Sequence, residues 1–435
     1  MRLIWKVLFL FLLSCAVESG FVIAYQSAAE GRLAGVIAAH TESFTSETIP
    51  SVENIDLVHD DWVKVAHFES TFYKIKFFVD IIIGLIFAWV LIMGGVSAAI
   101  AHKARELSQS VHVSRGLYLA FYSLLFSGLL LPVDISGYLI GQFRGTLLSS
   151  PDIVAISFIG NTIIGILFAL LLYIPLYFLI DKMRHWWWLV CGVFVSAFTI
   201  FTIFIGPVVI DPLYIDAEPL TDPAIIAIVE DVAKKADVPL ERVYVSNTFG
   251  ATLESNAMVV GLGKTKRVIL DDTLLKFYTP DEISTIVAHE LGHYVFGHMV
   301  RTIVIMTLIT LLTFWLLAVI LQFLIRRYGR HIKARQVNDI VLYPLIGTLL
   351  GFISLILAPI PSYVNRTFEM QADRYSIELT HKPEATLTSL TKLTYQSFMD
   401  PAPPPILQWW LGTHPTQQER IEYAKSQVGL NKPNK

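Results

Sequence analysis

Residues 287–298 read VAHELGHYVFGH, and the five letters HELGH within this run decide how the rest of the chain is interpreted. Residues four apart lie on one face of a helix, so the imidazoles of His289 and His293 can reach the same metal ion. Glu290 then lies beside the water that completes the shell of Zn²⁺ in hydrolases. The motif predicts a site that holds zinc and hydrolyses peptide bonds.

The residues before the motif favour a helix built around it over an accidental match. HExxH should occur by chance in on the order of 1 in 100 chains of this composition, and a surface helix can carry it without a function. Here Thr279, Pro280 and Glu282 form a capping box with proline at the first helical position. Apolar residues then recur at helical spacing and leave the motif residues as polar exceptions. These apolar residues are Ile283, Ile286, Val287 and Leu291.

The composition predicts a membrane protein. Hydrophobic residues make up 54% and charged residues only 16% of the 435 positions, whereas charged residues alone reach about 25% in soluble domains. Seven apolar stretches have the length of a helical span. They lie near residues 4–24, 77–101, 116–140, 153–180, 186–210, 300–325 and 340–360. The first could equally be a signal segment, because Arg2 and Lys6 precede its apolar run and Glu18 interrupts it.

A change in composition divides the chain into two predicted domains. Residues 1–210 form an N-terminal membrane domain, in which the acidic stretch 25–76 reads as a water-exposed connector. Residues 211–435 form a zinc metallopeptidase domain that includes the hairpin of spans at 300–360. The expected fold class is therefore mainly α, a polytopic helical membrane protein with a small α+β metalloprotease unit.

Outside the spans, the second domain has the periodicities of a soluble unit. We expect helices at 223–236, 367–379 and 383–396, strands at 243–246, 257–260 and 267–270, and a last helix capped by Thr416 and Glu419. The net charge of −3 argues against a nucleic acid partner. Cys15 and Cys191 both fall in apolar runs, so they build neither a disulfide framework nor a zinc site.

Connectivity suggests a third metal ligand. A catalytic zinc ion takes three protein ligands and keeps one position open. The two spans after the motif would form a hairpin, so the chain returns after residue 360 to the side that it left. Glu369 then lies near the motif, and Asp373 follows one turn later, where a carboxylate could orient a ligand histidine. Without this connectivity, an acid pair four residues apart would more often be a solvated helix face.

HELGH, a pair of spans and then ExxAD at 369–373 resemble the type I CAAX prenyl endopeptidase family, and more distantly the HtpX-type membrane proteases. Two further segments are similar to that family: SNAMVVGLGKTKRVILDDTLL at 255–275 and THPTQQERI at 413–421. The resemblance covers about residues 77–425. It implies a multi-span membrane metalloprotease that acts on peptide or protein substrates, which could be lipidated or membrane-associated.

The resemblance also implies roles for individual residues. It implies one Zn²⁺ held by His289, His293 and Glu369, with Glu290 as general base. Asp373 would not bind the ion but would orient a ligand histidine.

The remaining implied roles concern the substrate. Asn256, Ala257 and Met258 would lie on a strand that pairs with an extended peptide. His414 and Arg420 would face the cleft and stabilise the oxyanion or the substrate backbone. On the residues alone, Asn256 could instead be a turn residue and His414 an ordinary loop histidine.

Two other functions fit parts of the pattern. An HtpX-like protease for quality control of membrane proteins would carry the same motif, but the resemblance to that type implies fewer spans. A transporter or scaffold with a structural metal site would close the metal with a fourth protein ligand. It would need no acid beside a metal-bound water, so Glu290 favours catalysis.

Basic loops predict which side of the membrane the motif faces. Lysine and arginine gather at 103–115, 182–184 and 326–335, and Arg2 and Lys6 lie at the N-terminus. Positive loops stay in the cytoplasm. With seven spans, the charge pattern places the motif on the extracytoplasmic side of a bacterial cytoplasmic membrane, whereas the family resemblance implies the cytosolic side.

Overall fold

The computed structural model consists of two compact units. It describes residues 2–28, 35–36, 55–58, 60–144, 151–206, 217–247, 255–261 and 266–430. The span unit comprises residues 1–38, 74–197 and 307–357, and the motif unit comprises residues 39–73, 198–306 and 358–435. The hairpin of spans that follows the motif therefore belongs mostly to the span unit.

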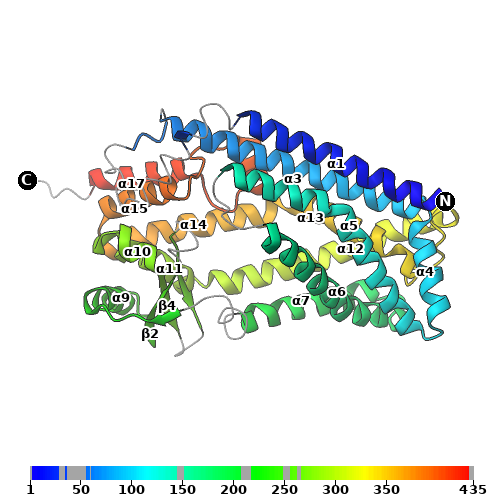
Figure 1. Ribbon diagram of the computed structural model, residues 1–435. Helices are drawn as coiled ribbons and strands as arrows, with labels where there is room; N and C mark the ends of the chain where they lie inside the picture. The colour runs from blue at the N-terminus through cyan, green and yellow to red at the C-terminus, as the bar shows by residue number, and fades with distance from the viewer. Residues whose placement is uncertain are drawn as a thin grey trace, which may run out of the picture. The chain divides into compact units, whose positions relative to one another are not determined.

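Seven helices among the described residues are long and apolar enough to cross a membrane, as predicted (Figure 1). They are α1 (Arg2–Ala28), α3 (Asp61–Met93), α5 (Val111–Arg144), α6 (Pro151–Lys182), α7 (Trp187–Ile205), α12 (His298–Ile332) and α13 (Tyr343–Leu357), the last preceded by the 3-10 turn η5 (Ile340–Leu342). Lipid offers backbone groups no hydrogen-bond partner, so spans take the helical form. The chain is a multi-pass membrane protein.

The second predicted span has different bounds from those expected. α3 begins at Asp61, so residues 61–76 are helical and are not part of a water-exposed connector. Trp62 in this segment is buried and packs edge-on against Tyr395, with ring centroids 5.3 Å apart. The helix ends at Met93, and Gly95 follows with a φ of 76°, a conformation that glycine adopts readily. The short helix α4 (Val96–Leu107) then begins. Residues 29–34, 37–54 and 59 of the connector lie outside the described residues.

Two sets of charged side chains inside the span unit are paired. Lys76 of α3 lies 2.9 Å from Glu18 of α1 and 2.9 Å from Asp80. Arg115 of α5 donates to Asp181 of α6, with an Nη2–Oδ1 distance of 3.1 Å. A charge within a membrane segment is costly unless it has a partner. These pairs therefore join α1 to α3 and α5 to α6.

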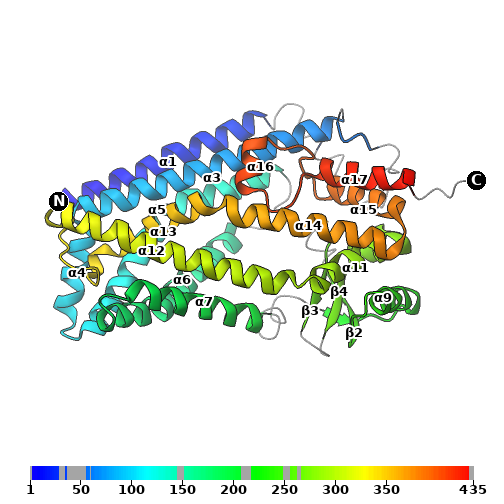
Figure 2. The same cartoon turned by 180° about the vertical axis from the view of Figure 1, so that it is seen from behind.

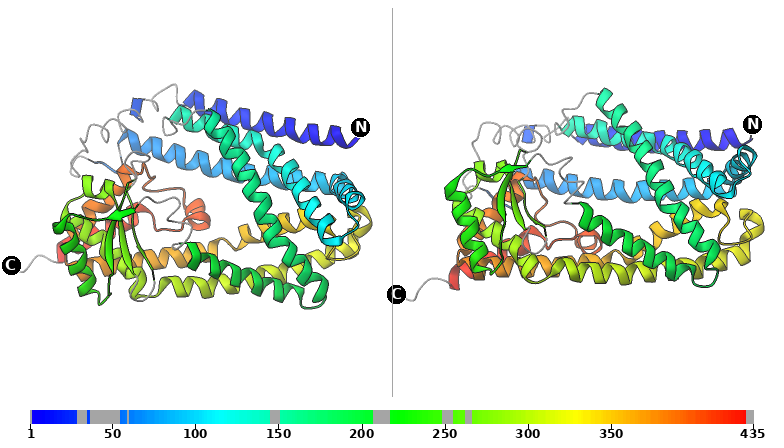
Figure 3. Two further views of the ribbon diagram at one scale, coloured as in Figure 1. Left: turned by 60° about the horizontal axis from the view of Figure 1, so that its bottom comes forward. Right: turned by 90° about the horizontal axis from the view of Figure 1, so that it is seen from below.

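The motif unit contains a four-stranded sheet with the order β1–β2–β4–β3. Its strands are the green arrows in Figure 3. The strands are β1 (Ala217–Pro219), β2 (Arg242–Ser246), β3 (Ala257–Val260) and β4 (Arg267–Asp271). β2 and β4 are parallel, and the two outer strands pair antiparallel with them. The three predicted strands are confirmed, and β1 was missed because three residues carry no readable alternation. Within the described sheet, β3 pairs with β4 only and is an edge strand.

α11 (Pro280–Val295) is the central helix of the motif unit and packs against α9, α14, α15 and β3 (Figure 2). Most of its apolar face is buried, with Val287 and Leu291 both at 0% exposure. The other helices are α9 (Pro223–Lys235), α10 (Asp272–Phe277), α14 (Pro359–Thr380), α15 (Pro383–Gln396), α16 (Pro405–Leu411) and α17 (Gln417–Leu430). α10 and α16 were not predicted, because each is too short to show a periodic pattern.

Candidate active site

The capping box that the sequence predicts is present at the start of α11. The Thr279 hydroxyl accepts a hydrogen bond from the backbone N–H of Glu282 at 3.3 Å. The Glu282 carboxylate accepts one from the backbone N–H of Thr279 at 2.7 Å. Lys392 of α15 lies 2.7 Å from the same carboxylate. The helix start is held in place, and the apolar face packed into the core turns the motif residues toward a pocket.

Gly292, inside the motif, allows α11 and α14 to approach closely. A Cβ on Gly292 would lie 3.3 Å from the Cα of Ala372, so a larger residue would push the helices apart. Ser376 of α14 donates to the carbonyl of Thr285 on α11 at 2.7 Å. This close packing brings Glu369 of α14 to the two histidines of the motif.

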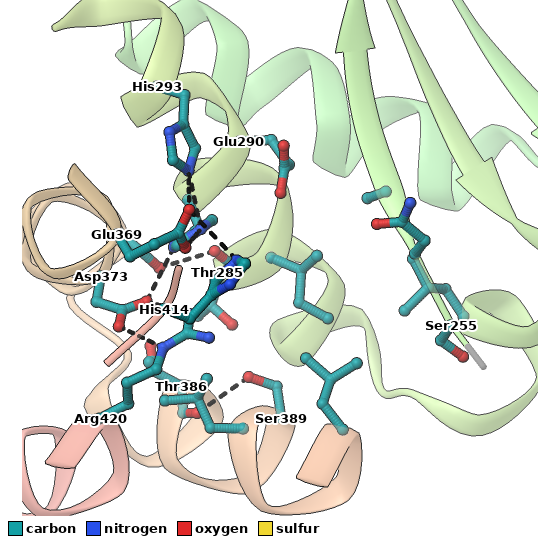
Figure 4. Close-up of a pocket in the computed structure, with 18 residues that line it drawn as sticks. Ser255, Thr285, Glu290, His293, Glu369, Asp373, Thr386, Ser389, His414 and Arg420 are labelled. Carbon is teal, nitrogen blue, oxygen red and sulfur yellow. Dashed lines mark hydrogen bonds and ion pairs between the residues drawn. The ribbon is translucent and has the colours of Figure 1, made fainter. Parts of the chain in front are cut away.

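Three side chains form a group that can hold a metal ion. The Nε2 atoms of His289 and His293 lie 3.2 Å apart. Glu369 places Oε2 3.3 Å from Nε2 of His289 and Oε1 3.5 Å from Nε2 of His293 (Figure 4). All three ligand atoms lie within 4.8 Å of one another, and the described residues contain no other such group. Two imidazole nitrogens and one carboxylate oxygen are a donor set of catalytic zinc sites, so these residues fit the ion.

Asp373 and Arg420 support His289 at Nδ1, the ring nitrogen that does not face the metal-binding group. Asp373 Oδ1 lies 2.9 Å from Nδ1 of His289. The Arg420 guanidinium donates to both oxygens of Asp373 at 2.7 Å. Burial opposes ionisation of Asp373, but the charge and hydrogen bonds of Arg420 hold its pKa well below the usual range. The ionised carboxylate can therefore accept a hydrogen bond from a protonated Nδ1 of His289, which leaves Nε2 free for a metal.

Arg420 lines the pocket, and two of its guanidinium nitrogens donate to Asp373. We predicted a cleft residue that stabilises the oxyanion, and this role stays a prediction. The two donors are Nε and Nη2, and the residue is only 9% exposed. Sequence spacing could not reveal this pairing, because the two residues lie on helices brought together only by the fold.

Glu290 and His414 line the pocket beside the group. Figure 4 shows Glu290 on the side of the pocket that faces Ser255. Burial raises the pKa of Glu290 to about 7, a value suited to accepting and returning a proton near neutral pH. His414 Nε2 lies 3.5 Å from Oε1 of Glu369, and its backbone carbonyl accepts from Gln408 at 2.6 Å. The fold thus brings His414 to the site.

The pocket around these residues has a volume of about 500 Å³. It gathers nearly all of the predicted site residues: Asn256, Ala257, His289, Glu290, His293, Glu369, Asp373, His414 and Arg420. Met258 is not among the lining residues.

The register of β3 explains why the backbone N–H of Met258 is not placed to donate a hydrogen bond to a substrate. The backbone carbonyl of Asn256 accepts a hydrogen bond from the backbone N–H of Asp271, so the backbone N–H and C=O of Asn256 point toward β4. In an antiparallel pair, successive residues direct N–H and C=O to opposite sides. Met258, paired with Ile269, therefore points its backbone toward β4 as well. By the same alternation Ala257 directs its N–H away from β4, to the edge that no described strand occupies, and our prediction for Met258 is corrected accordingly.

The fold and the site together define an integral membrane metalloendopeptidase. The model of peptidase family M48 matches residues 219–428, and the model described as the CAAX prenyl protease N-terminal domain, with five membrane helices, matches residues 45–215. The chain belongs to peptidase family M48, in its type I CAAX prenyl protease branch, and is a hydrolase.

Individual proteins show the same relationship. The chain is 29% identical to the metalloprotease YhfN of Bacillus subtilis over 370 residues, which are 83% of this chain and 85% of that protein. It is 28% identical to CAAX prenyl protease 1 of Saccharomyces cerevisiae over 249 residues, and spans about half of that relative's length, 54%. The crystal structure of S. mikatae Ste24p has the same fold, with a TM-score of 0.71 and 22% identity over 94% of this chain and 98% of that one.

Proposed function

We propose that this chain is a zinc endopeptidase in which His289, His293 and Glu369 hold the ion. The observation that carries the proposal is the convergence of three ligand atoms within 4.8 Å. Among the described residues, no fourth His, Cys, Asp or Glu joins this group, which favours an open catalytic position over a closed structural site. The ion, when bound, supplies an acidified water and polarises the scissile carbonyl.

The protein groups then have distinct tasks. Glu290 accepts a proton from the attacking water and returns it to the leaving amine. His414 donates to the oxygen on which negative charge develops. Asp373, held by Arg420, keeps His289 in the orientation and tautomer that a ligand needs.

The metal assignment is tested with the purified full-length protein. We expect about one zinc ion per chain by elemental analysis. A chelator should abolish cleavage of a peptide library, and zinc should restore it. The Glu290→Gln protein, purified in the same way, controls for contaminating proteases. Cleavage that survives complete removal of metal would refute the proposal.

We infer that the substrate lies extended along the free edge of β3. Ala257 is the described residue of this edge that both lines the pocket and directs its N–H outward. Main-chain hydrogen bonds of this kind give affinity that is independent of side chains. The relatives named CAAX prenyl proteases make a lipidated peptide the first substrate to compare, using matched peptides with and without a farnesyl group.

Replacing Ala257 by proline should weaken peptide binding and leave the metal in place. Proline deletes the outward N–H, and one such hydrogen bond contributes about 0.5–1.5 kcal/mol, so KM should rise roughly 2- to 10-fold. Edge strands tolerate proline where the N–H faces outward. Steady-state kinetics and zinc content of the variant measure both parts of the prediction.

Met258→Pro is the matched control for this experiment. It removes a hydrogen bond between β3 and β4, so its main effect should be a lower melting temperature. An Ala257→Pro protein that melts like the wild type and keeps an unchanged KM would remove β3 from the substrate path.

The charge pattern predicts that the site faces the extracytoplasmic side of a bacterial cytoplasmic membrane. Seven spans put the segments before the first span and after the last one on opposite sides. The basic loop at 326–335 joins the two spans of the hairpin, so it lies on the opposite side of the membrane from the motif. This loop and the other basic loops are expected in the cytoplasm. An alkaline phosphatase fused after Lys435 should therefore be active. An expressed but inactive fusion, together with an active cytoplasmic reporter at the same point, would place the site in the cytosol.

A further inference from the structure

Besides His414, one further histidine, His298, contacts the metal-binding group without being one of its ligands. His298, at the start of α12, is 3% exposed. Its Nδ1 lies 3.0 Å from Nδ1 of His293, on the side of that ring opposite to the metal-facing Nε2. Its own Nε2 lies 3.1 Å from Oε1 of Gln371 on α14. The contacts form one chain from Gln371 through His298 to His293.

Gly297 makes this contact possible. On an uninterrupted helix, residues five apart point about 140° away from each other and cannot meet. Here α11 ends and Gly297 takes a φ of 62°, in the left-handed region that glycine adopts without strain. The break turns the chain so that His298 comes back to His293. Phe368 of α14 then holds the His298 ring, with centroids 4.2 Å apart and planes within 10°.

The chain of contacts determines where the protons lie. When Nε2 of His293 offers its lone pair to a metal, Nδ1 must carry the proton. His298 then has to accept at Nδ1, so its own proton lies on Nε2. That proton is donated to the amide oxygen of Gln371.

We propose that His298 is a positioning residue that sets the tautomer and ring orientation of His293 for metal binding. The inference rests on the proposed function, which makes His293 a ligand. The two ligand histidines are then supported differently, His289 by the charged pair of Asp373 and Arg420 and His293 by a neutral chain. Loss of such an outer partner typically weakens metal binding 10- to 100-fold.

The test compares His298→Leu with His298→Asn in the full-length protein. Both variants lose the ring that stacks on Phe368, but the amide oxygen of asparagine can replace Nδ1 as the acceptor. We expect His298→Leu to weaken zinc binding about 10- to 100-fold in competition with a chromophoric chelator. His298→Asn should recover most of that loss. The visible spectrum of the Co²⁺-loaded protein should change in His298→Leu and return toward the wild type in His298→Asn.

Three outcomes would overturn the inference. Wild-type zinc affinity in a folded His298→Leu protein would do so, and so would equal losses in the leucine and asparagine variants. If His298→Leu does not fold, Gln371→Met becomes decisive, because it removes the acceptor at the far end of the chain and leaves both rings. An unchanged affinity and Co²⁺ spectrum in Gln371→Met would also refute it. Zinc content of the wild type, measured first, separates these results from a failure of the proposed function.

Discussion

Replacing Glu290 by glutamine is expected to lower turnover about 10²- to 10⁴-fold while the metal stays bound. The substitution keeps the size and shape of the side chain but removes its ability to take a proton. Glu290 lines the pocket and is not one of the three clustered ligand residues, so the ligand geometry should be unaffected. Its pKa, raised by burial to about 7, is the property that glutamine cannot reproduce.

Turnover number, zinc content and melting temperature of Glu290→Gln should be measured together. A protein that has lost zinc as well would show that Glu290 supports the metal rather than the proton transfer. Turnover within a few-fold of the wild type would exclude this residue as the general base and direct attention to His414.

Replacing Glu369 by alanine should abolish both metal binding and hydrolysis. Glu369 is the one carboxylate in the group, and it approaches both motif histidines to 3.5 Å or less. Two neutral imidazoles alone hold zinc weakly, so the loss should exceed the roughly 10- to 100-fold that removal of an outer partner costs. Elemental analysis and a chelator competition measure the metal, and peptide cleavage measures the activity.

Glu378→Ala is the matched control for this variant. Glu378 lies on the same helix, α14, but is exposed to solvent. It should retain zinc and activity at the wild-type level. If metal and turnover survived in Glu369→Ala, another residue would have to supply the third ligand, and the donor set assigned above would be wrong.

The sequence alone determined the parts of this protein that depend on short-range geometry. The HELGH spacing and the capping box at Thr279 act within a few turns of one helix, and both are present in α11. The length and apolarity of each span are likewise local, and seven spans were predicted and found. Glu369 and Asp373 were reached by connectivity, because a hairpin of spans must bring the chain back to the side that it left.

Local composition gave a wrong secondary structure where contacts with distant residues stabilise a helix. Residues 61–76 follow an acidic stretch and read as the end of a solvated connector, yet they begin α3. Burial of Trp62 against Tyr395, far along the chain, stabilises helix there. No window of neighbouring residues contains that contact.

Only the tertiary structure decided how the side chains of the site divide their tasks. The pairing of β3 with β4 directs the backbone of Met258 away from the free edge. The packing of α17 against α14 commits Arg420 to Asp373. The left-handed turn at Gly297 returns His298 to His293, although the helical periodicity of the sequence places them on different faces. In each case the partner lies on another element or beyond a helix break, so periodicity and spacing carry no information about it.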